Sequence, residues 1–283
     1  MRQAINRQDL LAGLFLLLLP LLLFWPVTLG PYTLLPLDNL FTFEPWLSFR
    51  DEIGVGLPQN QLLSDLVLEN YVWKKFTLQT LAAGQLPLWN PYLFAGQPFL
   101  ANGQHSALYP FTLLFYLLPL PKAYGWFTVS QLGLAGLNMY IFLRVLRASR
   151  LGALVAGITY SLSGFFTMVI AGAAWLPLLL ACLEMVIRKQ EEKGPSPYSP
   201  VPYIVTGAGV LGIQALAGHV EITYYSLLVS GFYAGCRLLV LWRRQAIPRF
   251  ALVLSGWLLS LVLLGLGLGA AHRRVVGTPL LNM

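Results

Sequence analysis

Two aspartates stand at the same distance from a tryptophan in the first long polar stretch of the chain. Asp38 precedes Trp46 by eight residues, and Asp65 precedes Trp73 by eight residues. A carboxylate beside an aromatic side chain could act as the general base that activates a sugar hydroxyl, or could bind a divalent ion on a lipid phosphate. The alternative is that these acids are solvated and that the tryptophans anchor the loop at a membrane surface. We take Asp65 and Asp38 as the catalytic candidates and leave the participation of a metal ion open.

A second group of polar and aromatic residues could form a binding site for a polar ligand. Most of them follow the aspartates, in the segment from Leu86 to His105. Two others adjoin an apolar run, where an ionisable residue is a functional candidate because its burial in lipid is costly. The alternative for these two is a cap in interfacial water. The substrate-binding candidates are Trp89, Asn90, Gln97, Gln104, His105, His219 and Glu221.

Several other catalytic chemistries lack their residues in this chain. The three histidines and two cysteines form neither an H-E-x-x-H motif nor a Cys/His cluster, which excludes metalloprotease chemistry. The sequence also contains no glycine-rich phosphate loop and no G-x-S-x-G motif. Both Cys182 and Cys236 fall within apolar runs, so no disulfide framework is predicted.

The elements that must position these residues are apolar helices. Hydrophobic residues make up 57% of the chain and charged residues 10%, whereas a soluble domain carries about 25% charged residues. Since a helix needs about 20 apolar residues to cross a bilayer, we predict an all-α, polytopic helical bundle of about seven spans. The runs are Leu10–Leu29, Ala123–Leu143, Leu151–Ile187 (long enough for two crossings), Pro202–Ala217, Ile222–Leu241 and Phe250–Ala271. The shorter run Leu108–Leu120 is expected to be re-entrant or to lie along the membrane.

The basic residues predict the orientation of these spans. Twelve of the eighteen Lys and Arg residues fall on one face, which the positive-inside rule assigns to the cytoplasm together with the N-terminus. The net charge of +7 is therefore no indication of a nucleic-acid partner. The predicted parts are residues 1–29 (N-terminus and first span), 30–107 (extracytoplasmic loop with the candidate site), 108–271 (bundle) and 272–283 (tail). The first run could instead be a signal peptide, but it is too long and no A-x-A-like cleavage site follows it.

Motifs along the chain resemble those of the YfhO-like family of bacterial membrane proteins. They are Leu62–Asp65, Tyr71–Trp73, Gly84–Pro91, Gly96–Pro98, Ala101–Asn102, Tyr109–Pro110, Trp175–Pro177 and Gly218–His219. That family is similar to the GT-C glycosyltransferases, multispanning enzymes that take a sugar from a polyprenyl-phosphate carrier on the extracytoplasmic face. The resemblance implies that an acidic residue of the first loop is essential, with Asp65 as the first candidate and Asp38 as its competitor. Val72 departs from the family, which has a proline before this tryptophan.

The resemblance also implies a reaction and a location. It predicts transfer of a hexosyl group from a polyprenyl-phosphate donor to an envelope glycan or lipid acceptor, in the bacterial cytoplasmic (inner) membrane, with a divalent cation as a conceivable cofactor. Family members are longer, and the tail His272–Met283 is basic and short, so we expect an N-terminal fragment that is inactive alone. The rival hypothesis is a non-catalytic membrane component or a transporter of lipid-linked envelope precursors, which would not need an essential carboxylate.

Overall fold

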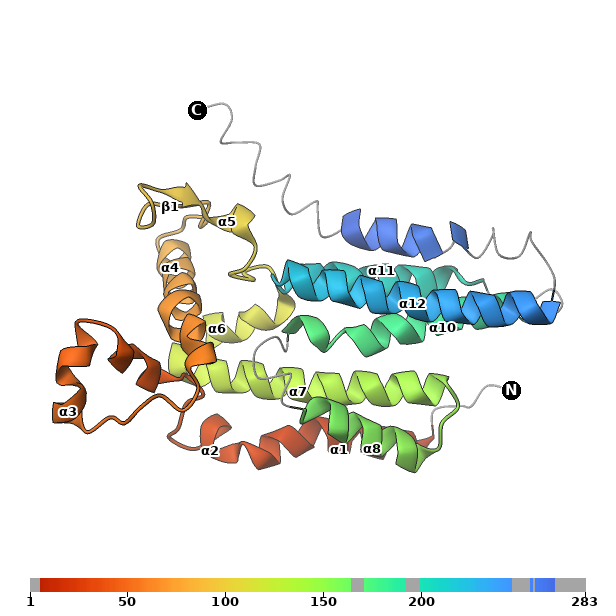
Figure 1. Cartoon of the computed structure of the whole chain (residues 1–283), viewed down its shortest axis with the longest axis horizontal. Coiled ribbons are helices and arrows are strands. Elements are labelled where there is room, and N and C mark those ends of the chain that lie inside the picture. Colours follow the sequence, from red (N-terminus) through yellow and green to blue (C-terminus); the bar gives the residue numbers. More distant parts are fainter. Residues whose placement is uncertain (1–5, 164–170, 192–198, 246–254, 257, 268–283) are drawn as a thin grey trace. The chain divides into compact units, whose positions relative to one another are not determined.

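The computed structural model describes residues 6–163, 171–191, 199–245, 255–256 and 258–267. It is 75% helix with almost no strand, which confirms the prediction of an all-α protein. Its two short strands, β1 (Trp89–Asn90) and β2 (Gln97–Pro98), form one antiparallel hairpin. In Figure 1 the helices are coloured by their position along the chain, from red at the N-terminus to blue near the C-terminus.

Three of the described helices are long and apolar enough to cross a membrane. They are α7 (Leu120–Val145), the segment Ala171–Lys189 that includes most of α10 (Leu176–Glu191), and Val220–Leu241 within α12 (Val220–Gln245). Two shorter apolar helices, α11 (Val201–Leu216) and Leu258–Gly267, fall below that length. The described residues therefore support a helical membrane protein with three candidate spans, fewer than the seven that hydropathy predicts.

The predicted first span differs most clearly from the structure. Leu10–Leu29 is divided into α1 (Arg7–Leu23) and α2 (Trp25–Thr28), with the break at Phe24. Pro26 sits in the first turn of α2, where a proline fits a helix start, and it lacks the N–H that a continuous helix would bond to the Leu22 carbonyl. With 17 residues, α1 is at the short end of the range of about 17–25 residues for a crossing, and it is not among the three candidate spans.

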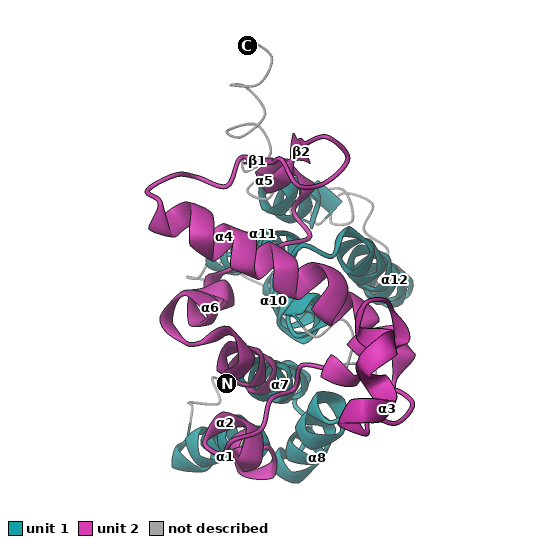
Figure 2. Ribbon diagram, turned by 90° about the vertical axis from the view of Figure 1, so that its left-hand side faces the viewer, with its two compact units in different colours: residues 1–20, 130–283 teal, residues 21–129 magenta. Residues whose placement is uncertain are grey.

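The chain forms two compact units, which Figure 2 colours separately. Unit 1 comprises residues 1–20 and 130–283, and unit 2 comprises residues 21–129. Unit 2 thus contains the predicted loop 30–107 together with the end of α1, all of α2 and the start of α7. Unit 2 extends beyond the predicted loop because the start of α7 is hydrogen-bonded to the segment around α2. The Lys122 ammonium donates to the carbonyl oxygens of Val27, Gly30 and Tyr32. The predicted tail, residues 272–283, lies outside the described residues.

Unit 2 is a chain of short helical turns around one longer helix, α4 (Tyr71–Ala82). The others are η1 (Leu37–Thr42), η2 (Trp46–Phe49), α3 (Arg50–Ile53), η3 (Gln61–Leu63), the π-helical turn η4 (Leu66–Asn70), α5 (Phe99–Asn102), η5 (Pro110–Thr112) and α6 (Leu113–Leu117). The predicted short segment Leu108–Leu120 corresponds to η5 and α6, which are too short to cross a bilayer.

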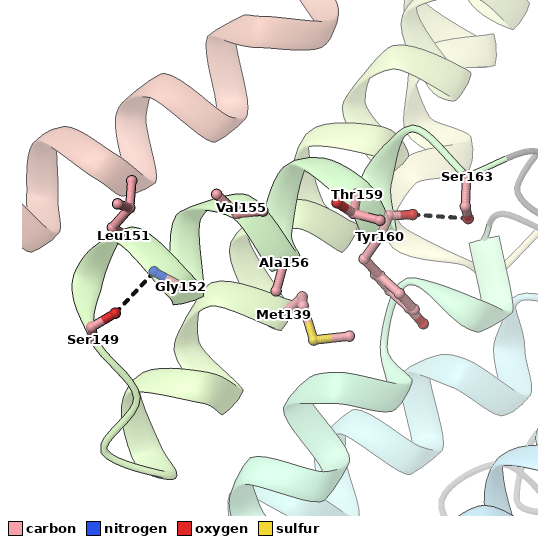
Figure 3. A pocket seen from close by; sticks show the side chains of 9 residues that line it. All are labelled: Met139, Ser149, Leu151, Gly152, Val155, Ala156, Thr159, Tyr160 and Ser163. Atoms are coloured by element: carbon pink, nitrogen blue, oxygen red, sulfur yellow. Dashed lines mark hydrogen bonds between the residues drawn. The ribbon is translucent and has the colours of Figure 1, made fainter.

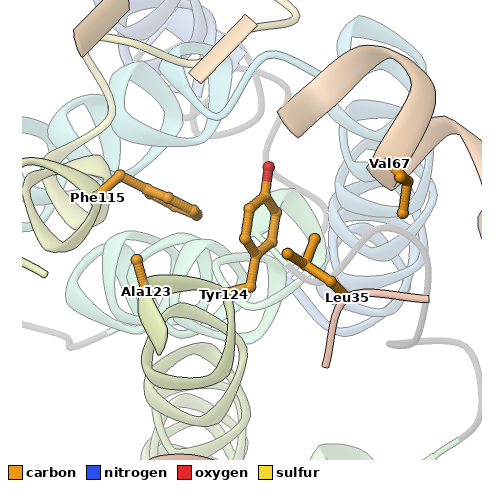
Figure 4. Packing of buried hydrophobic residues seen from close by; sticks show 5 residues of the cluster. All are labelled: Leu35, Val67, Phe115, Ala123 and Tyr124. Carbon is orange, nitrogen blue, oxygen red and sulfur yellow. The ribbon is translucent and has the colours of Figure 1, made fainter. Parts of the chain in front are cut away.

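A small apolar core joins the helical turns of unit 2. Leu35, Val67, Phe115, Ala123 and Tyr124 pack together, so that η4, α6 and the start of α7 share one buried cluster (Figure 4). The Tyr124 hydroxyl donates to Asn70 Oδ1 at 2.7 Å, which satisfies the polar end of a largely buried ring. This core fixes η4, the turn that directly follows Asp65.

Unit 1 is built on close helix packing. A β-carbon at Gly157 of α8 (Arg150–Ser161) would lie 2.9 Å from the Gly136 carbonyl oxygen of α7, so the two backbones approach closely at these glycines. The Asp9 carboxylate joins α1 to α7, accepting from the Tyr140 hydroxyl at 2.7 Å and from Arg144 Nε at 3.0 Å. Gln214 Nε2 donates to Ser226 Oγ at 2.6 Å and links α11 to α12.

Candidate functional site

Asp65 is an exposed carboxylate at the point where the loop enters η4 and α4. The preceding turn, η3, is capped by Asn60, whose Oδ1 accepts from the Leu62 amide at 3.1 Å. The Asp65 side chain makes no capping hydrogen bond to η4, and no other described residue holds it by a hydrogen bond or ion pair. A carboxylate with no internal partner is available to a ligand, as a general base or an ion ligand must be.

Asp38 has a different environment from Asp65. It is half-buried in η1, and its Oδ2 accepts from the Gln59 amide at 2.9 Å. Beside it, the buried Asn39 donates from Nδ2 to the Asn60 carbonyl at 3.1 Å. These two bonds hold η1 against the segment that leads to Asp65, and η1 also packs against η4. The structure therefore brings the two aspartate-bearing segments together and gives Asp38 a structural contact that Asp65 lacks.

The equal spacing of the aspartates to Trp46 and Trp73 does not reflect equal surroundings. Trp46 is exposed on η2, whereas Trp73 is buried on α4. Trp73 is part of the packed interior of unit 2, and only Trp46 fits the description of an exposed anchor. Among the described residues, no group of three or more His, Cys, Asp or Glu side chains is arranged to hold a metal ion.

Two of the expected substrate-binding residues are buried and engaged by the protein itself. Asn90 Oδ1 accepts from the Tyr92 amide at 3.0 Å, which starts the hairpin turn. The His105 ring stacks on Phe99 with centroids 4.4 Å apart, and its Nδ1 accepts from the Ala107 amide at 3.0 Å. Its Nε2 lies 3.3 Å from the Leu100 carbonyl, so we assign the proton to Nε2. Both side chains are therefore buried residues that stabilise the conformation of the loop.

The remaining candidates of this segment lie nearer the surface. Trp89 is partly exposed on β1, and its ring covers Gly96, where a β-carbon would come within 2.5 Å of the indole Nε1. Gln97 is half-buried and faces Asn90 in the strand register. Gln104 is exposed. Within unit 2, Trp89 and Gln104 thus remain accessible to a ligand.

His219 and Glu221 belong to unit 1, at the start of α12. Gly218 precedes them with a φ of 93°, a left-handed conformation that suits glycine and ends α11. His219 is half-buried, and burial lowers its pKa, an effect that the nearby Glu221 carboxylate opposes. Glu221 is exposed. These two residues form a feature separate from the aspartate segments of unit 2.

Lys74 is a feature of the site region that the sequence reasoning missed. Its side chain is 3% exposed, and Nζ donates to the His105 carbonyl at 2.6 Å, to Ser106 Oγ at 3.0 Å and to Thr112 Oγ1 at 3.5 Å. The ammonium also lies 4.9 Å from the centre of the Phe115 ring. None of the described carboxylates pairs with it. Lys74 therefore ties α4 to the segment from His105 to Thr112. The local sequence gives no signal for this, because the three acceptors lie 31 to 38 residues further along the chain.

The buried lysine predicts a pH-dependent stability. Burial lowers the pKa of Lys74 from 10.5 to about 7. Between these values the unfolded chain binds the proton and the folded chain does not, so the free energy of unfolding rises with pH from about 7 to 10.5 and falls again on acidification. At about 1.4 kcal/mol per pKa unit, the change is on the order of 5 kcal/mol. Thermal unfolding in detergent at several pH values measures it.

A matched pair of variants isolates this effect. Lys74→Met is expected to remove the rise in stability above pH 7, whereas Lys75→Met, one residue away and exposed, is expected to keep it. An unchanged pH profile in Lys74→Met would contradict the assignment, whatever the absolute stability of that variant.

Glu184 is the centre of a buried charged cluster in unit 1. Glu184 is 1% exposed, and Arg188 Nε lies 2.7 Å from its Oε1. Its Oε2 accepts from Arg237 Nε at 2.8 Å and from the Tyr233 hydroxyl at 2.7 Å. Arg188 also donates to the Val145 carbonyl at 2.5 Å, so the cluster joins α7, α10 and α12.

An open groove runs along α8 in unit 1. It has a volume of about 750 Å³ and an apolar lining (Figure 3). Met139 of α7 contributes to it, and Leu151, Val155 and Ala156 of α8 form much of its wall. None of the described residues that line it is acidic or basic, so this part of the groove offers space for a hydrocarbon chain.

Comparison of the chain with protein-family models, with curated proteins and with solved structures finds no match. The family resemblance is thus carried by the sequence motifs alone. The geometry described above supplies the physical basis for a proposal on function.

Proposed function

We propose that this protein is a membrane glycosyltransferase of the GT-C-like kind, which transfers a sugar from a polyprenyl-phosphate carrier to an envelope acceptor. The observation that carries the proposal is the free, exposed carboxylate of Asp65, at the entrance to the π-helical turn η4. π-helical turns are frequent at functional sites. Both ends of unit 2 continue into apolar helices, so a lipid-linked donor is a fitting substrate for a site in this unit.

In the proposed sugar transfer, Asp65 and Asp38 have different roles. Asp65 takes the proton of the acceptor hydroxyl as that oxygen bonds to the anomeric carbon of the donor sugar. The bond from that carbon to the carrier phosphate breaks, and polyprenyl phosphate leaves with the bonding electrons. Asp38 accepts a hydrogen bond from the Gln59 amide and thereby keeps the segment that precedes Asp65 in position. A divalent ion could bind the carrier phosphate with Asp65 as a ligand.

The second candidate function is a non-catalytic membrane component or a transporter of lipid-linked precursors. The apolar groove along α8 favours it, because the groove could hold a lipid chain without any acid–base chemistry. This function needs no free carboxylate, so a variant of Asp65 separates it from the transferase.

Reconstitution in lipid vesicles tests the proposal, and because this chain is expected to be inactive alone, the assay uses a full-length relative that carries the same loop motifs. We expect radiolabelled sugar to move from polyprenyl-phosphate hexose donors to extracted envelope glycans or lipids, with release of polyprenyl phosphate. Chelation by EDTA shows whether a metal ion takes part. Movement of a fluorescent carrier analogue across the vesicle without sugar transfer would favour the transporter.

We also propose that the N-terminus is cytoplasmic in the bacterial inner membrane and that the loop 30–107 is extracytoplasmic, from the distribution of basic residues. In a background lacking the two free cysteines, Gln59→Cys is expected to react with an impermeant thiol reagent in intact cells. Ser149→Cys, beside the arginines that follow α7, is expected to react only after lysis. Labelling of Ser149→Cys alone in intact cells would reverse the orientation.

A further inference from the structure

A continuous segment of 46 residues in unit 2, from Phe76 to Pro121, contains no formal charge. From Phe76 to Pro121 the sequence has no Asp, Glu, Lys or Arg, whereas the segment from Asp38 to Lys75 has nine. A water-facing loop of this length normally carries charged residues, since charged residues are about 25% of an average soluble domain. The uncharged segment therefore has the composition of a surface that meets lipid.

The hairpin within this segment is rigidly built. Its strands pair Trp89 with Pro98 and Asn90 with Gln97, and the Gly96 amide donates to the Leu93 carbonyl at 2.7 Å across the turn. Three successive residues of the turn have left-handed backbones, with φ of 49° at Phe94, 63° at Ala95 and 110° at Gly96. A phenylalanine in this region is strained, and such strain is kept where it has a use.

This rigid turn presents aromatic side chains outward. Phe94 is 92% exposed and Tyr92 is 81% exposed, while Trp89 is 44% exposed at the base of the hairpin. Leu86, just before the hairpin, is exposed as well. Tryptophan and tyrosine concentrate at the boundary between lipid and water, where an apolar ring and a polar tip are both satisfied.

The hairpin and the turn after it pack against Phe76, near the middle of α4. The Phe76 ring of α4 meets Tyr92 with centroids 6.1 Å apart and Phe99 with centroids 4.9 Å apart. Figures 1 and 2 both show α4 lying across the start of α7, not along it. Since α7 is long and apolar enough to cross a membrane, a helix that lies across its start would run along the membrane surface.

We propose that the hairpin from Leu86 to Gln97 docks onto the bilayer beside the protein and inserts Phe94, Tyr92 and Trp89 into the lipid interface. A lipid surface fits better than a sugar ligand, because sugar recognition needs polar groups beside the aromatic rings. The Asn90 amide oxygen of the hairpin is already used by the Tyr92 amide. The docking does not depend on the transferase reaction, since it involves neither aspartate.

Spin labels measure the depth of the hairpin directly. In a background lacking Cys182 and Cys236, Phe94→Cys carries a nitroxide in vesicles of phosphatidylethanolamine and phosphatidylglycerol. We expect this label to collide with dissolved oxygen more than with a water-soluble nickel chelate, at a depth of roughly 5–10 Å within the headgroup and acyl boundary. A label at Tyr92→Cys is expected to show the same preference.

The matched control is Gln59→Cys, an exposed position in the charged half of the same unit. Its label is expected to be fully open to the nickel chelate. Equal nickel access at positions 94 and 59 would overturn the proposal and leave the hairpin in water. A label at position 94 that is immobile and closed to both reagents would also overturn it, because a protein partner would then cover the hairpin.

Discussion

Replacing Asp65 by asparagine is expected to lower sugar-transfer activity by about 100-fold or more, the low end for loss of a general base. Asparagine keeps the shape of the side chain but cannot accept the hydroxyl proton or supply a charged oxygen to a metal ion. Asp65 is exposed and unpaired within the described residues, so the change removes no internal contact. The fold should therefore stay intact, and the loss should appear in kcat. The reconstituted transfer assay measures it, with the unfolding temperature as a check.

Two other aspartates serve as controls for this variant. Asp51 is exposed on α3, and Asp51→Asn is expected to keep full activity. In Asp38→Asn the amide oxygen can still accept from the Gln59 amide, so we expect a smaller loss than for Asp65→Asn; Asp38→Ala removes that contact and should lose more. If Asp65→Asn transfers sugar as fast as the unaltered protein, the enzymatic proposal fails and the transporter becomes the better account.

Replacing Glu184 by leucine is expected to destabilise the protein by about 3–5 kcal/mol, the usual cost of removing one partner of a buried ion pair. The carboxylate is 1% exposed and accepts from Arg188, Arg237 and Tyr233. Without it two guanidinium groups lose their counter-charge inside unit 1, where water cannot replace it fully. Thermal or denaturant unfolding in detergent measures the change.

A compensated variant separates unpaired charge from lost packing. Changing Glu184, Arg188 and Arg237 together to leucine removes all the charges at once, and it should recover much of the stability lost in Glu184→Leu. Glu221→Gln, an exposed acid at the start of α12, is the neutral control. An unfolding temperature for Glu184→Leu equal to that of the unaltered protein would show that the cluster contributes no stability.

The sequence by itself determined the class of the protein and its longest helices. Ala123–Leu143 and Ile222–Leu241 were predicted correctly as helices, within α7 and α12, because an uninterrupted apolar run of that length can satisfy its backbone only as helix in lipid. Leu10–Leu29 is equally apolar but contains Pro26, and the break there follows from local chemistry that hydropathy does not count. The sequence also located the aspartate segments and the aromatic segment from Leu86 to His105, but not the hairpin that this segment forms.

Only the tertiary structure decided which polar residues are free and which are engaged. Asp38 and Asp65 have similar sequence surroundings, yet one accepts from Gln59 and the other has no partner within the described residues. Lys74 is buried because its three acceptors come from positions 31 to 38 residues away. Burial of a polar group depends on such distant contacts, and local pattern carries no information about them. For that reason the sequence could name the candidates of the site, and only the fold could assign them different tasks.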